Sequence, residues 1–157
     1  MNYAIFSALY VALPEVFVLC MAMLILLVDL FLTESTRFVT YILTQLTLLG
    51  AAVITVVTHT PTITYAFTGM FVDDPLSDLL KLMIYLAVAV GLVYSRTYIS
   101  LRGMFRGEYF VLSLFAMLGM MIMVSGQNFL SLYMGLELLS LCLYSLVALD
   151  RDNPRAT

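Results

Sequence analysis

The sequence predicts an all-α fold, a polytopic membrane bundle of about five transmembrane helices. Hydrophobic residues make up 63% of the 157 positions and charged residues 11%, with a mean hydropathy of +1.06. Those values lie well outside the range of soluble globular domains. The apolar residues also occur in runs of about twenty, the length that a helix needs to cross a hydrocarbon core of about 30 Å. The shorter alternating segments typical of membrane β-barrels are not found.

We expect the helices at residues 13–32, 38–57, 76–95, 109–125 and 129–149, in a single membrane domain. No Lys or Arg precedes the first run, and no small-residue cleavage site follows it, so this run is predicted to be a retained helix and not a signal peptide. The break between His59 and Pro75 is the longest of the three outer segments and is rich in Thr and aromatic residues. It predicts a small extended hairpin on the membrane surface.

The arginines predict the orientation, because cytoplasmic segments of membrane proteins retain positive charge. All six arginines lie in alternate segments: Arg37, Arg96, Arg102, Arg106, Arg151 and Arg155. The segments on the other side contain no Lys or Arg. The pattern places the N-terminus outside the cell and the C-terminal tail in the cytoplasm.

Several classes of function have no support in the sequence. The net charge of −3 and the scattered basic residues give no indication of a nucleic-acid partner. Cys20 and Cys142 both lie inside apolar runs and are expected to be buried, unpaired side chains. Phosphate loops, paired-cysteine motifs, histidine clusters and hydrolase triads cannot be assembled, so we expect this chain to bind no nucleotide, haem, iron–sulfur cluster or metal.

Most of the ionisable groups near the spans have a simple structural interpretation. Glu15 follows Pro14 at the start of the first helix, where a carboxylate gains from the helix N-terminus and can reach water. Asp78 and Lys81 are three residues apart near the outer end of the third helix, so they are expected to pair on one face, with Lys81 extending toward the surface. His59 is expected to be an interfacial residue without a specific role.

Glu137 has no such interpretation, because it lies two residues from the centre of the last window. A charged group at that depth costs about 2.5 to 3.5 kcal/mol on insertion scales. At helical spacing it shares a face with Tyr133, Ser140 and Tyr144. One interpretation is a neutral carboxyl group that holds helices together by hydrogen bonds. The other is a proton relay whose occupancy responds to a movable positive partner on another helix.

Small and hydroxyl-bearing residues on other helices predict close packing between backbones. The second helix has such a stripe, and the fourth has Ala116 and Gly119. The members of the stripe are Thr44, Thr47, Ala51, Thr55 and Thr58.

The last helix and several shorter segments resemble one family. Residues 128–149, with the core Gly135-Leu-Glu-Leu-Leu-Ser-Leu141, closely resemble the fifth helix of subunit N of proton-pumping NADH-quinone oxidoreductase, respiratory complex I. Supporting matches are Leu13-Pro14-Glu15, Phe71-Val72-Asp73, Glu108-Tyr109-Phe110 and the tail at residues 151–157. Related antiporter-like subunits more often have Trp before the glutamate, whereas this chain has Leu136.

The resemblance implies the function. In that family the glutamate of helix five works in proton translocation with a lysine on helix seven, so Glu137 takes the glutamate's role. The chain resembles the N-terminal third of a longer subunit of the bacterial inner membrane, and alone it should not pump. Its partners would be lipid and the other membrane-arm subunits, while NADH, FMN, iron–sulfur and quinone chemistry would lie in other subunits. Alternatives are a subunit of a cation/proton antiporter and a membrane scaffold protein without catalytic function.

Overall fold

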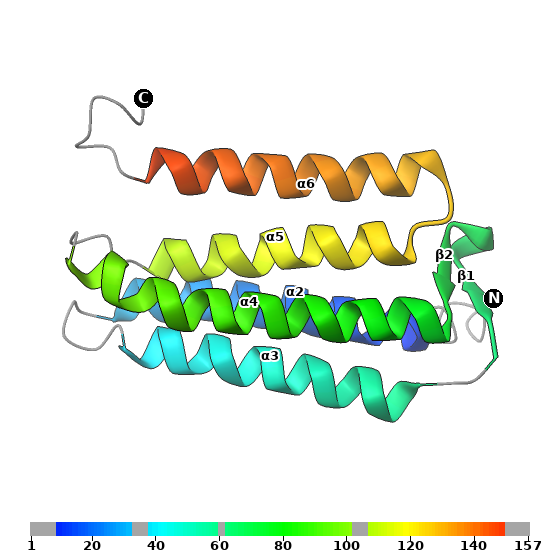
Figure 1. The fold of residues 1–157 in the computed structure, drawn as a ribbon, viewed down its shortest axis with the longest axis horizontal. Helices are drawn as coiled ribbons and strands as arrows, with labels where there is room; N and C mark the ends of the chain where they lie inside the picture. Colours follow the sequence, from blue (N-terminus) through cyan, green and yellow to red (C-terminus); the bar gives the residue numbers. More distant parts are fainter. Residues whose placement is uncertain (1–8, 33–37, 60–61, 102–106, 150–157) are drawn as a thin grey trace.

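Five long helices form an antiparallel bundle in the computed structural model (Figure 1). The structure describes residues 9–32, 38–59, 62–101 and 107–149. The helices are α2 (Leu13–Phe31), α3 (Phe38–Thr58), α4 (Pro75–Leu101), α5 (Gly107–Ser125) and α6 (Phe129–Ala148). Each is long and apolar enough to cross a membrane. The predicted polytopic helical membrane protein is thereby confirmed.

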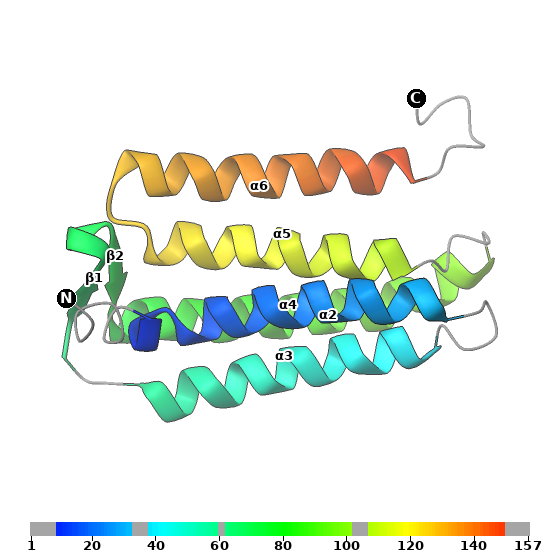
Figure 2. The same ribbon diagram turned by 180° about the vertical axis from the view of Figure 1, so that it is seen from behind.

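The helices are arranged around α5, which packs against the other four (Figures 1 and 2). Half of the apolar window of α5 is buried, compared with 11% of that of α6. Helix α6 forms an outer layer whose main contacts are with α5. Most of the surface of α6 therefore faces away from the rest of the described bundle.

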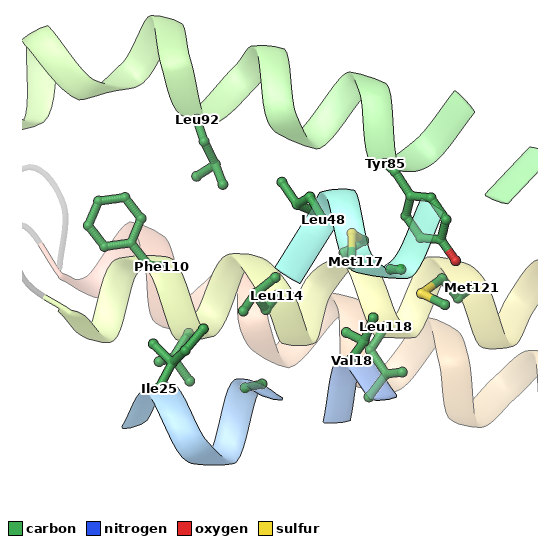
Figure 3. Close-up of a cluster of buried hydrophobic side chains, with 13 residues drawn as sticks. Val18, Ile25, Leu48, Tyr85, Leu92, Phe110, Leu114, Met117, Leu118 and Met121 are labelled. Atoms are coloured by element: carbon green, nitrogen blue, oxygen red, sulfur yellow. The ribbon is translucent and has the colours of Figure 1, made fainter. Parts of the chain in front are cut away.

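The core lies between α2, α3, α4 and α5 and is filled by aliphatic, aromatic and Met side chains (Figure 3). Lipid is as apolar as these side chains, so close packing is the main favourable contribution of this core within the membrane. Its largest apolar members with negligible exposure are Phe110, Ile25, Leu114, Met117 and Met121.

The hydroxyl stripe of α3 packs inward as predicted. Thr44, Thr47 and Thr55 are fully buried, and each hydroxyl donates a hydrogen bond of 2.8 to 2.9 Å to the carbonyl four residues earlier. Each of the three buried hydroxyls therefore has a hydrogen-bond partner within its own helix and needs none from a neighbouring helix.

Close contact between α5 and α6 depends on two glycines. A Cβ atom built on Gly119 would lie 2.8 Å from the Gly135 carbonyl oxygen, and one built on Gly135 would lie 2.7 Å from Met123 Cγ. Both separations are shorter than ordinary contacts of a Cβ atom. The backbones of α5 and α6 can therefore approach this closely because both positions are glycine.

Four of the helices end within two residues of the positions expected from hydropathy, and α4 does not. It continues to Leu101, six residues beyond the expected end at Ser95. Its 27 residues span about 40 Å at 1.5 Å per residue, more than the hydrocarbon core requires. The extra turns are held by packing: Ile99 is buried, and the Arg96 guanidinium lies 4.9 Å from the centre of the Phe38 ring. Hydropathy detects the hydrocarbon boundary and not the end of the helix.

The segment between α3 and α4 forms the expected hairpin. Strand β1 (Thr64–Ala66) pairs antiparallel with β2 (Phe71–Asp73), with Thr64 opposite Asp73. The 3₁₀ turn between them, Phe67–Gly69, has positive φ at all three residues. The hairpin also contacts the turn between α5 and α6, since Met70 O accepts hydrogen bonds of 3.1 Å from Gln127 N and Ser131 Oγ. We refer to this end of the bundle as the hairpin end.

Candidate functional site

The structure places the polar stripe of α6 on the surface of the described bundle. Tyr133 and Tyr144 are 62% and 72% exposed, Glu137 is exposed, and Ser140 is partly buried. Gly135 and Cys142 are the buried residues of the helix. Within the described residues, Glu137 makes no hydrogen bond or ion pair, so any positive partner for it lies outside them.

A second polar region, buried at the hairpin end, has Lys81 at its centre. Lys81 is fully buried, and its Nζ lies 2.8 Å from Glu15 Oε1 and 3.9 Å from Asp73 Oδ1. The ammonium is also 5.3 Å from the centre of the Phe71 ring. The Lys81 ammonium of α4 therefore attracts a carboxylate of α2 and a carboxylate of β2.

Two predictions about these residues are wrong. Lys81 does not extend to the surface or pair with Asp78; among the described residues its carboxylate partners are Glu15 and Asp73. Glu15 does not reach water from the helix N-terminus, since it is only 7% exposed. Both errors have the same cause: the starts of α2 and α4 meet at the hairpin end, and the hairpin covers the space into which Lys81 was expected to extend.

Asp78 lies on the same buried face of α4 and has a different partner. Its Oδ2 is 2.7 Å from Nδ1 of His59, which follows the end of α3. Asp78 is 6% exposed, whereas the His59 side chain is 45% exposed. His59, expected to have no specific role, is the exposed member of the cluster.

Asp73 completes this group, which we call the hairpin-end cluster: Glu15, His59, Asp73, Asp78 and Lys81. Burial and the neighbouring Asp78 carboxyl raise the pKa of Asp73 to about 6, although Lys81 acts in the opposite direction. The Asp78 carboxyl is therefore close enough to disfavour ionisation of Asp73.

The start of α4 fixes the position of the cluster. Asp74 Oδ1 accepts a hydrogen bond of 2.9 Å from Ser77 N, and Asp74 N donates one of 3.0 Å to Ser77 Oγ. This reciprocal cap sets the first turn of the helix directly after β2. Asp78 and Lys81 follow within the next turn, so the strand and the helix present their charged side chains to the same space.

The polar region continues inward along α4. Tyr85 is four residues after Lys81, on the same face, and its hydroxyl is 3.1 Å from Thr55 Oγ1 of α3. Both side chains are buried. On α4 itself, the residues one turn further along, Val88 and Ala89, are apolar.

The ionisable side chains of both polar regions can bind and release protons. Across the described ranges, no three His, Cys, Asp or Glu side chains are arranged to hold a metal ion. The hairpin-end cluster and the stripe containing Glu137 are separate groups of ionisable side chains inside a membrane bundle, where such groups are costly and are usually functional.

The fold and these groups define a class: a polytopic α-helical membrane protein with ionisable side chains held between its helices. No protein-family model matches the chain. It is 70% identical to NADH-quinone oxidoreductase subunit N of Methylovorus glucosotrophus over 155 residues, 98% of this chain and 32% of that protein. The subunit N proteins of Thiobacillus denitrificans and Nitrosomonas europaea are 56% and 52% identical over 146 residues, 93% of this chain and 30% of each protein.

Over nearly its whole length, therefore, the chain is a homologue of subunit N of NADH-quinone oxidoreductase. It spans about a third of the length of the curated relatives that it matches.

Proposed function

We propose that this chain is part of a membrane-arm subunit of a proton-pumping NADH-quinone oxidoreductase in a bacterial inner membrane, and that Glu137 takes part in proton translocation. The observation that carries the proposal is the 70% identity to a subunit N over 98% of the chain. Divergence at that level preserves both fold and role in most families. The ionisable side chain of Glu137 at mid-membrane depth supports its role in proton translocation.

The exposed position of Glu137 suits a relay group. A carboxyl group on the open face of α6 can meet a positive side chain from another helix, and the distance between them can set its proton affinity. Tyr133, Ser140 and Tyr144 share this part of α6 and can orient water beside the carboxyl. We propose that this chain binds none of the redox cofactors, and that the other subunits of the oxidoreductase bind NADH, FMN, the iron–sulfur clusters and quinone.

The test is Glu137→Gln in the full-length subunit within the assembled oxidoreductase. Gln keeps the size and hydrogen-bonding ability of the side chain and cannot release a proton. We expect the complex to assemble, with proton pumping and coupled NADH:quinone activity each reduced at least tenfold, the scale of losing a positioned acid or base. Pumping is measured in membrane vesicles by the quenching of a pH-sensitive dye during NADH oxidation.

Two further variants on α6 separate the possible roles. Glu137→Asp retains the acid and should retain part of the pumping. Ser145→Ala removes a hydroxyl whose hydrogen bond, among the described residues, is to the Leu141 carbonyl of its own helix, and it should pump normally. Normal pumping by Glu137→Gln would reject the relay role; if an apolar replacement then prevented assembly, Glu137 would instead hold helices together. Sodium-dependent proton exchange without NADH would indicate an antiporter subunit.

A further inference from the structure

The hairpin-end cluster contains more negative than positive charge in a space with little water. Glu15, Asp73 and Asp78 are each at most 9% exposed and Lys81 is fully buried. With all three carboxyl groups ionised, one ammonium would leave two uncompensated negative charges, which is unfavourable in such surroundings. At least one bound proton is therefore part of the stable state of the cluster.

The other groups facing this space do not remove the imbalance. From α3 come His59, which is the other potential cation, and the Thr55 hydroxyl, which bonds to Tyr85 of α4. The Asp74 carboxylate adds negative charge and is occupied by the Ser77 backbone. Helix α5 has no ionisable side chain after Tyr109.

Buried atoms in the cluster also lack partners. Glu15 Oε2 has no hydrogen-bond partner among the described residues, and the 2.8 Å contact between Lys81 Nζ and Glu15 Oε1 does not have hydrogen-bond geometry. Such unmet capacity in fully buried polar groups is rare. Here it leaves an acceptor position on Glu15 that a proton can fill.

His59 provides a route for that proton. Its ring is partly exposed on one side and touches Asp78 on the other. It also lines a pocket of about 240 Å³, together with Thr55, Val56, Pro75, Asp78, Leu79 and Leu82. The polar residues of this lining, Thr55, His59 and Asp78, lie among apolar ones.

We propose that the hairpin-end cluster is a proton-binding site that exchanges protons with water at this end of the bundle through the His59 imidazole. A proton from water binds Nε2 while the proton on Nδ1 passes to Asp78 Oδ2. The ring stays neutral with its hydrogen on Nε2, and the net result is one proton moved from water to a carboxylate. Exchange of the ring hydrogen with water restores the starting tautomer.

Within the cluster, the proton comes to rest on Asp73, whose carboxyl lies 3.9 Å from the Lys81 ammonium. Burial raises the pKa of Asp73 to about 6, so its occupancy changes within the physiological range. When Asp73 loses the proton, Lys81 is attracted to two carboxylates instead of one. This site is separate from Glu137 and does not depend on turnover.

The experiment is infrared spectroscopy of the resting, assembled protein, which detects the carbonyl stretch of protonated carboxyl groups and its shift in D₂O. We expect a band that weakens as pH rises through about 6 and is missing from Asp73→Asn. In His59→Gln the band should persist, with deuterium exchange slowed by about tenfold or more. Tyr65→Gln, a matched change at an exposed aromatic residue of the hairpin, should exchange at the normal rate.

Two results would overturn the proposal. Absence of a titrating band in the unaltered protein would mean that the cluster is a fixed ion-pair network joining the hairpin to the helices. Equal exchange rates in His59→Gln and the unaltered protein would exclude the histidine route. Because these measurements use resting protein and compare variants of the hairpin-end cluster, a failure of the proposed pumping role of Glu137 would not affect them.

Discussion

At the scale of single residues, Lys81 contributes most to the organisation of the hairpin end. It is the only lysine in the chain, and it is fully buried against carboxylates from α2 and β2. Buried ion pairs contribute little net stability compared with apolar side chains that fill the same space, but removing one partner leaves an uncompensated charge. Glu15 and Lys81 therefore each need the other to compensate a buried charge.

We expect Lys81→Met in the full-length subunit to lower the free energy of unfolding by about 3 to 5 kcal/mol, because two buried carboxylates lose their cation. Lys81→Met combined with Glu15→Gln should recover a large part of that loss. Equilibrium unfolding of the detergent-solubilised protein measures both. A single variant that loses less than about 1 kcal/mol would indicate a solvated pair of the kind found on surfaces.

The two polar regions differ in how far the sequence could define them. Glu137 and the residues sharing its face follow from helical periodicity along one segment. The hairpin-end cluster requires contacts between α2, α3, α4 and β2, and such contacts have no periodic signal. One available signal was overlooked: in an antiparallel bundle, Glu15, His59 and Lys81 must all lie at the same end, whatever the details of packing.

At the scale of the helices, the contact between α5 and α6 is the most constrained. A Cβ on Gly135 would meet the Gly119 carbonyl oxygen at 2.8 Å, and a backbone atom cannot move aside as a flexible side chain does. In α4, by contrast, nothing lies within 4 Å of the position a Cβ would take on Gly91. The two glycines form a matched pair for substitution.

We expect Gly135→Ala to lower the free energy of unfolding by about 1 to 3 kcal/mol through overpacking. Gly91→Ala should be neutral or slightly stabilising, because Ala favours the helix more than Gly does. Thermal unfolding of the solubilised full-length subunit compares them directly. Equal effects at the two sites would mean that α6 can move away from α5 without cost.

The helices themselves were predictable because each is a long apolar run, a signal that depends on composition alone. The end of α4 was not, since its last six residues are held by packing of Ile99 and by the contact of Arg96 with the rings of Phe38 and Tyr41. The hairpin was predicted from its Thr and aromatic content. Its contact with the turn between α5 and α6 depends on Met70 O, a backbone atom that the sequence does not distinguish.

At the scale of the whole molecule, the two ends of the bundle differ in charge. Among the described residues, the hairpin end has four carboxylates, one buried lysine and a histidine, whereas the other end has two carboxylates, Asp29 and Glu108, and the exposed Arg96. Retention of arginine on the cytoplasmic side predicts that the hairpin end faces outward. With this orientation, the hairpin-end cluster would exchange protons with the outer aqueous phase.

Cysteine labelling tests the orientation. Thr68, in the hairpin, and Ser100, near the end of α4, are both exposed and lie at opposite ends of the bundle (Figure 1). Each is replaced by Cys in a full-length subunit whose own cysteines, including Cys20 and Cys142, are removed. In right-side-out vesicles a membrane-impermeant maleimide should label Thr68→Cys and leave Ser100→Cys unlabelled, and inside-out vesicles should reverse the pattern. Labelling of Ser100→Cys alone in right-side-out vesicles would show that the topology is the reverse of the predicted one. The hairpin-end cluster would then exchange protons with the cytoplasm.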